Sequence, residues 1–238
     1  MGNLQKTNTG LAKNISEDLL TICKADLDLE YRNKMDSARS ISESQDEYEK
    51  HLAKLDQQYS LVKADICDEW IGRCSTPQKT RKELARVTTL DGAMALMSPS
   101  LYTISRRKSK KHVLAYIKMW LIDLQGNLNI KNKLSQEMLD IASDTILTQF
   151  GVLTIADLKN VLTDALSGVY GEFYESISVP KVLSWFSEYF ERRCQAYAGN
   201  CLSDHTYYRN EATGWKERDR EQELTIADLR ALSNMNKQ

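Results

Sequence analysis

The densest group of chemically active side chains in the sequence is a run of cations, SRRKSKKH, at residues 105–112. Guanidinium and ammonium groups gathered at this density bind anions, and the phosphates of nucleic acid are a frequent partner. The nucleic-acid-binding residues predicted from this run and its upstream extension are Arg106, Arg107, Lys108, Lys110, Lys111, Lys79, Arg81 and Lys82. Two other interpretations remain open: a solvated linker, or a strip of cations that pairs with acidic helices of the same chain.

The charge of the chain is divided between two segments, although the total is only −1. Residues 17–69 hold 14 acids and 7 bases, a net of −7, whereas residues 73–118 hold 11 bases and 2 acids, a net of +9. Such asymmetry indicates that one segment faces an anionic partner, or that the two segments face each other.

Signatures of catalysis do not occur in the sequence. It contains no phosphate-binding P-loop, no glycine-rich dinucleotide pattern, no H-E-x-x-H and no G-x-S-x-G. Its three histidines lie apart from other potential ligands at helical spacing; they are His51, His112 and His205. We therefore expect a protein that is not an enzyme, with no cofactor and no small-molecule substrate.

Two cysteine pairs share a seven-residue step, Cys67 with Cys74 and Cys194 with Cys201. Zinc sites generally use closer pairs, with two to four residues between the cysteines. A seven-residue step also places two side chains on one face of a helix, as ordinary packing does. Free thiols are therefore the prediction, and no metal site is assigned.

The elements that hold these residues are predicted to be helices throughout. Only 10 glycines and 3 prolines occur in 238 residues, and alternating β-branched runs are absent; both features argue against strands. The predicted class is all-α, an antiparallel helical bundle with a long N-terminal helical extension. No apolar run approaches the ~18 residues that span a bilayer, and no signal peptide is visible, so we expect a cytoplasmic protein without membrane contact.

Composition divides the chain into five predicted segments. They are a flexible N-terminus (1–14), an acidic helical extension with a possible coiled coil (15–72), a basic connector with a short helix (73–112), a C-terminal helical bundle (113–199), and a polar loop with a terminal helix (200–238). Within the bundle, VLAYIKMWLIDL is too apolar for a surface helix and should be central. The next helix is expected to start at Ser135 and stop at Gly151.

An apolar seam at alternating spacings of four and three runs through Tyr48, Leu52, Leu55, Tyr59, Val62 and Ile66. About three heptads of this kind are typical of a coiled coil. The seam predicts partner-binding residues at Leu52, Leu55, Tyr59 and Val62. A helix that packs on its own domain accounts for the same pattern.

The hexapeptide LTIADL occurs twice, at residues 153–158 and 224–229. In the first copy Thr154 is a good N-cap, Asp157 completes a capping box, and Leu153 with Leu158 can form a hydrophobic staple. The second copy repeats these roles, but the surrounding residues differ. Two independent helix starts therefore explain the repeat better than a duplicated domain.

Aromatic and glycine residues concentrate after residue 168. Gly168 and Gly171 permit positive φ in a loop whose tyrosines, Tyr170 and Tyr174, either cover a helix end or dock a partner. Tyrosines and a tryptophan in the polar loop further on could stack on bases or pin that loop to the bundle.

The stretches YIKMWLIDLQGNLNIKNKLS, LTIADL, GVYGEFYESI and VLSWFSEYFERRCQ resemble a family of uncharacterised helical proteins encoded by phages and mobile elements of gut bacteria. The resemblance covers residues 113–197. The family has no established activity. The resemblance implies an accessory protein of phage or mobile-element DNA metabolism, loosely similar to helicase loaders and replisome organisers, that docks a protein partner through its helical bundle. The basic segment predicts the contact with nucleic-acid phosphates. The alternative is a structural adaptor that forms homo-oligomers through its N-terminal helices and binds no nucleic acid.

Overall fold

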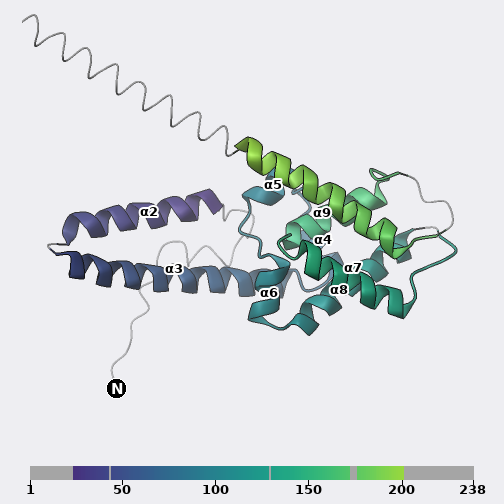
Figure 1. Ribbon diagram of the computed structural model, residues 1–238, viewed down its shortest axis with the longest axis horizontal. Helices are drawn as coiled ribbons and strands as arrows, with labels where there is room; N and C mark the ends of the chain where they lie inside the picture. Colours follow the sequence, from purple (N-terminus) through teal and green to yellow (C-terminus); the bar gives the residue numbers. More distant parts are fainter. Residues whose placement is uncertain (1–23, 43, 129, 172–175, 201–238) are drawn as a thin grey trace, which may run out of the picture. The chain divides into compact units, whose positions relative to one another are not determined.

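The computed structural model describes residues 24–42, 44–128, 130–171 and 176–200 (Figure 1). These residues form helices joined by short segments, and among them only isolated β-bridges occur, with no strand. The labelled helices are α2 (Lys24–Ile41), α3 (Gln45–Arg73), α4 (Pro77–Glu83), α5 (Leu90–Ala95), α6 (Leu101–Arg107), α7 (Lys110–Asn127), α8 (Gln136–Phe150) and α9 (Ile155–Leu166), and residues 179–200 are also helical. The predicted all-α class is confirmed.

The chain divides into two compact units, residues 1–190 and residues 191–238. Only residues 191–200 of the second unit are described, so the account below concerns the first. The segment 73–112, predicted as a connector, lies inside this first unit. It contributes the buried side chains Leu84, Ala93, Leu101 and Ile104 to the core.

Helix α7 occupies the centre of the core, as its apolar sequence predicts. It contacts α4, α6, α8 and α9, and its buried side chains lie on more than one face: Val113, Tyr116, Ile117, Trp120, Leu121 and Leu124. A helix that is apolar on several faces must be covered on several sides to remove that surface from water. The short helices α4 and α6 provide part of this cover.

The first LTIADL copy starts α9 as predicted. Thr154 is the N-cap of α9 and forms a capping box with Asp157. The Asp157 carboxylate is 0% exposed, and it accepts hydrogen bonds from the Thr154 backbone N–H at 2.9 Å, the Thr154 hydroxyl at 3.0 Å and the Tyr189 hydroxyl at 2.9 Å. The carboxylate therefore also fastens the helix at residues 179–200 to the start of α9. The second copy lies outside the described residues.

A pair of extended segments joins the starts of α6 and α9. The N–H of Leu101 donates to the Leu153 carbonyl at 2.9 Å, and the N–H of Ile155 donates to the Pro99 carbonyl at 3.2 Å. The Ala156 N–H donates to the Ser98 hydroxyl at 3.3 Å. Amides in the first turn of a helix have no partner within the helix, so each segment supplies partners to the helix that follows the other.

The glycines of the 168–174 loop have the predicted backbone. Gly168 has φ +77 and Gly171 has φ +93, conformations that side-chain-bearing residues rarely adopt. Between them, Tyr170 is buried and its ring stacks on Trp185 with centroids 6.1 Å apart. Of the two predicted roles, packing within the chain and docking of a partner, the structure gives Tyr170 the first. Tyr174 lies outside the described residues.

Helices α2 and α3 form an antiparallel hairpin (Figure 1), and Tyr59 of the predicted seam faces α2. Tyr59 stacks on Tyr31 of α2 with ring centroids 4.5 Å apart, and its hydroxyl bonds to Asp28. Both the hydrogen bond to Asp28 and burial of the ring raise the pKa of Tyr59, burial more strongly. The seam thus packs within its own chain at Tyr59, Val62 and Ile66; a partner-binding role for Leu52, Leu55, Tyr59 and Val62 stays a prediction.

Gly151 ends α8 as predicted, with φ −63 and not the left-handed conformation common at helix ends. The chain instead continues directly into the segment that pairs with residues 99–102. Glycine is needed there for space, because an added Cβ would lie 2.5 Å from Cε1 of Tyr102 and 2.5 Å from the Leu147 carbonyl oxygen.

Replacing Gly151 with alanine should therefore lower the free energy of unfolding by about 1–3 kcal/mol, the usual cost of overpacking. Gly126→Ala is the matched control, because a Cβ at residue 126 of α7 meets nothing within 4 Å. It should be neutral or stabilise by up to about 1 kcal/mol through helix propensity. Urea unfolding of both variants measures the difference, and equal effects would contradict this account of Gly151.

Replacing Asp157 with alanine should destabilise the fold by about 3 kcal/mol, because it removes a buried carboxylate that accepts hydrogen bonds from the Thr154 N–H and the Tyr189 hydroxyl. Glu137→Gln removes an exposed acid in the first turn of α8 and should cost only a few tenths of a kcal/mol. Urea unfolding measures both. A loss at Asp157 no larger than that at Glu137 would show that the buried network contributes little.

Candidate nucleic-acid interface

The predicted cations at residues 106–111 lie where α6 ends and α7 begins, a region called here the α6–α7 corner (residues 106–112). Helix α7 starts at Lys110, with Ser109 as its N-cap, and not near Val113 as the sequence suggested. The physical reason is the cap, since the Ser109 hydroxyl accepts the His112 N–H at 3.1 Å. Arg106 and Arg107 end α6, where the helix dipole favours cations, whereas Lys110 and Lys111 stand in the first turn of α7, where it does not.

Two cations of the corner pair with the acidic helix α3. Arg107 donates to both carboxylate oxygens of Asp68, from Nε at 2.9 Å and from Nη2 at 2.5 Å, and Lys108 Nζ lies 3.3 Å from Asp68 Oδ1. The hydrogen bond from Arg107 lowers the pKa of Asp68; burial opposes the shift, and Lys108 adds to it. For these two residues, the structure favours the interpretation of cations that pair with an acidic helix of the same chain.

Lys110 has a weaker partner. Its ammonium lies 2.7 Å from Asp144 of α8, and the two side chains are 61% and 53% exposed. Ion pairs this exposed contribute little to stability and are screened by salt. The pair therefore leaves Lys110 accessible to a competing anion.

Arg106 and Lys111 are exposed, and in the part of the chain that the structure describes neither takes part in an ion pair. The corner therefore presents five cations against two carboxylates, Asp68 and Asp144. The remaining positive charge is centred on the turn between the two helices.

An exposed tyrosine that the sequence did not single out lies beside these cations. Tyr102 precedes Arg106 by one turn of α6 and is 39% exposed. Its hydroxyl donates to the Thr148 carbonyl at 2.7 Å, and Thr148 lies one turn after Asp144, the partner of Lys110. Tyr102 and Lys110 therefore contact residues one turn apart on α8. The four-residue spacing of Tyr102 and Arg106 is the sequence signal that places the tyrosine beside the cation on one helix face.

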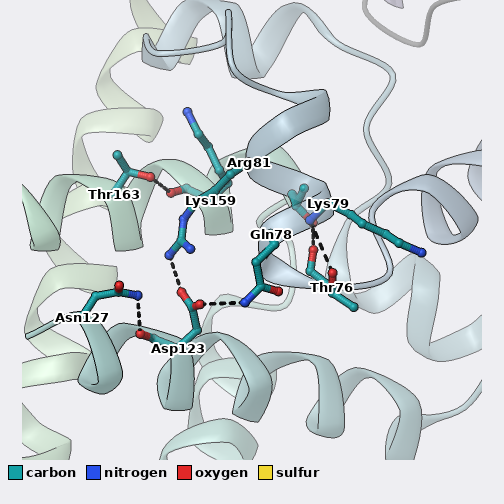
Figure 2. Close-up of polar contacts among 9 residues, drawn as sticks. Thr76, Gln78, Lys79, Arg81, Asp123, Asn127, Lys159 and Thr163 are labelled. Carbon is teal, nitrogen blue, oxygen red and sulfur yellow. Dashed lines mark hydrogen bonds and ion pairs between the residues drawn. The ribbon is translucent and has the colours of Figure 1, made fainter.

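The cations of α4 lie elsewhere. Figure 2 shows Arg81 and Gln78 converging on Asp123 of α7, in an ion pair with Arg81 and a 3.2 Å hydrogen bond from Gln78. The Arg81 guanidinium also lies over the Trp120 ring, 5.0 Å from its centroid. From Lys110 to Asp123 the axis of α7 rises by about 20 Å. The structure therefore separates the ion pair of Arg81 from Lys110, and Lys79 and Lys82 belong to the same short helix as Arg81.

Lys79 and Lys82 differ from Arg81 in their exposure. Both are exposed on α4; Lys79 Nζ reaches the Ser75 hydroxyl at 3.4 Å, and Lys82 forms no ion pair with any residue that the structure describes. They remain accessible cations, but at a second location.

Lys159, drawn in Figure 2, is a buried cation that the sequence did not reveal. Its ammonium donates to the Val87 carbonyl at 2.7 Å and to Asn160 Oδ1 at 3.2 Å. Burial, with a smaller effect of Arg81, lowers the pKa of Lys159, and Asp164 opposes the shift. Asn160 Nδ2 donates to the Thr89 carbonyl at 3.2 Å, so the two side chains together attach the segment before α5 to α9.

The cysteines of the described residues are free thiols. Cys67 and Cys74 are buried, and burial raises the pKa of both, that of Cys74 to about 12. Cys194 is exposed, while Cys201 and His205 lie outside the described residues. Across the described ranges no group of three or more His, Cys, Asp or Glu side chains could hold a metal ion.

Comparison of the chain with protein-family models, with curated proteins and with solved structures finds no match. The resemblance of residues 113–197 therefore stays a prediction. None of the helices described is long and apolar enough to cross a membrane.

Proposed function

We propose that the protein is an accessory nucleic-acid-binding protein that holds backbone phosphates at the α6–α7 corner. The observation that carries the proposal is the excess of five cations over two carboxylates there, with Arg106 and Lys111 exposed and unpaired among the described residues. Neutralising phosphates releases the counterions condensed on nucleic acid, and this release drives sequence-independent binding.

The partners of the other cations suit exchange with a phosphate. Lys110 and Asp144 are more than half exposed, so a phosphate oxygen can replace the Asp144 carboxylate at little cost. Asp68 holds Arg107 through two hydrogen bonds and is the stronger competitor. Tyr102 adds an exposed ring beside Arg106, and aromatic rings next to cations are stacking platforms for unpaired bases. A single strand therefore fits the corner better than a duplex.

The cellular setting of this binding rests on the resemblance of residues 113–197. We place the protein in phage or mobile-element DNA metabolism, as a cytoplasmic factor that resembles helicase loaders or replisome organisers and performs no catalysis. In that setting the helical bundle docks a protein partner while the corner holds the nucleic acid.

A second candidate function is a protein adaptor that binds no nucleic acid. It is favoured by four exposed apolar side chains on neighbouring helices, Met119 and Ile122 of α7 and Met138 and Ile141 of α8. Exposed apolar clusters mark protein interfaces. On this view Arg107, Lys108 and Arg81 serve only to form ion pairs within the chain.

Reversing the two unpaired cations separates these candidates. The double variant Arg106→Glu, Lys111→Glu should bind a labelled single-stranded DNA at least about tenfold more weakly at low salt, and the salt dependence of its affinity should flatten by about 1 per lost phosphate contact. Fluorescence anisotropy across a salt series measures both quantities.

The matched control is Lys79→Glu, Lys82→Glu, which changes the net charge equally on α4. It should leave the affinity within about threefold of the parent if the corner is the site. Equal losses in both double variants would assign the binding to net charge alone. No binding by the unaltered protein at low salt would overturn the proposal in favour of the adaptor.

Neutralising Asp68 should strengthen DNA binding, the opposite of the effect expected for the Arg106 and Lys111 variant. Asp68→Asn frees Arg107 and Lys108 for phosphate, so DNA affinity should rise by about two- to fivefold at low salt, and the rise should diminish as salt screens the corner. The same anisotropy titration measures it. A weaker affinity, in a variant whose circular dichroism and thermal midpoint match the parent, would show that Asp68 positions Arg107 and does not compete for it.

A further inference from the structure

The side chain of Tyr102 is held in one position by contacts with the end of α8. Its hydroxyl donates to the Thr148 carbonyl at 2.7 Å, and its backbone N–H donates to the Gly151 carbonyl at 2.8 Å. The ring itself lies against Gly151, since a Cβ added there would come within 2.5 Å of Cε1 and 2.6 Å of Cζ. Both ends of the side chain are therefore fixed before any ligand binds.

These contacts leave part of the Tyr102 ring open to solvent. The side chains of Trp120, Trp185 and Phe186 in the core are no more than 1% exposed, whereas Tyr102 is 39% exposed. A group that is already fixed loses little conformational freedom when a ligand contacts it. Tyr102 therefore offers a rigid, flat surface on which a planar ligand can stack.

The cation next to this ring indicates the chemistry of the ligand. Arg106 follows Tyr102 by four residues on α6, and residues at this spacing lie on the same face of a helix. Arg106 is exposed and forms no ion pair with the residues that the structure describes. A ligand that meets both side chains must carry a planar ring about 5 Å, one helical turn, from an anionic group. A nucleotide of a single strand carries both, a base and a phosphate.

We propose that Tyr102 makes the α6–α7 corner selective for unpaired bases, by stacking on one base while Arg106 holds a neighbouring phosphate. This role rests on the nucleic-acid binding proposed above. A base pair inside a duplex is covered on both faces by its neighbours, so only the phosphates of a duplex reach the corner. Because every base has a π face, the stacking does not depend on sequence. Gly151 and Thr148 are positioning residues that act through the ring.

The test uses the full chain and two labelled single strands of DNA of equal length, one of which carries abasic sites in place of its bases. The two strands have the same phosphates, so the difference in affinity measures the bases. In fluorescence anisotropy at low salt, the unaltered protein should bind the normal strand about five- to tenfold more tightly than the abasic strand. Tyr102→Leu should remove this preference and leave the affinities for the abasic strand and for duplex DNA unchanged.

Three further variants serve as controls. Tyr102→Phe keeps the ring and its contact with Gly151 and loses only the hydrogen bond to Thr148, so it should keep most of the preference. Tyr197→Leu removes a tyrosine outside the corner that is 62% exposed and should leave both affinities unchanged. Arg106→Glu should weaken binding of both strands, because both carry phosphates. Circular dichroism and the thermal midpoint of each variant confirm that it is folded.

Three outcomes overturn the proposal while leaving phosphate binding at the corner intact. They are equal binding of the two strands by the unaltered protein, a loss in Tyr102→Leu that is equal for both strands and for duplex DNA, and a preference that Tyr102→Phe loses as completely as Tyr102→Leu. The second outcome would give Tyr102 a purely structural role. Binding of neither strand by the unaltered protein would overturn the proposed function, and this role of Tyr102 with it.

Discussion

The arrangement of the first unit depends on one buried carboxylate. Asp157 has no exposed surface, and a charge in that position is tolerated only when donors surround it. Thr154 and Tyr189 supply those donors, which fixes where α9 starts and which turn of the helix at residues 179–200 lies over it. Because the segment before α9 also pairs with residues 98–102, the same interaction fixes the start of α6 and therefore the position of Arg106 at its end.

Features that depend on neighbouring residues could be predicted from the sequence. The capping box of Thr154 and Asp157 and the positive φ of Gly168 and Gly171 follow from rules that act over a few residues. The apolar face of α3 was also visible, since it needs only a regular spacing. Which helix covers that face was not: the S-x-x-E pattern at Ser44 marks the start of α3, but no local rule says that Tyr31 packs on Tyr59.

Contacts between distant residues explain the rest. Tyr189 meets Asp157 and Arg107 meets Asp68 across more than thirty residues, and no spacing rule connects such positions. The core role of residues 73–112 was missed for another reason: α4, α5 and α6 are six or seven residues long, too short to show a helical period. Tyr102 lies in α6, and because this helix is so short the sequence pointed to its cations and not to the tyrosine beside them.

Helix α3 joins the α2–α3 hairpin to the core and to the α6–α7 corner. Its middle turns pack against α2 through Tyr59, and its later turns bury Ile66, Cys67 and Trp70. Asp68 lies among these buried residues in the sequence and pairs with Arg107 and Lys108. The turns of α3 that enter the core therefore also set the position of two of the five cations at the corner.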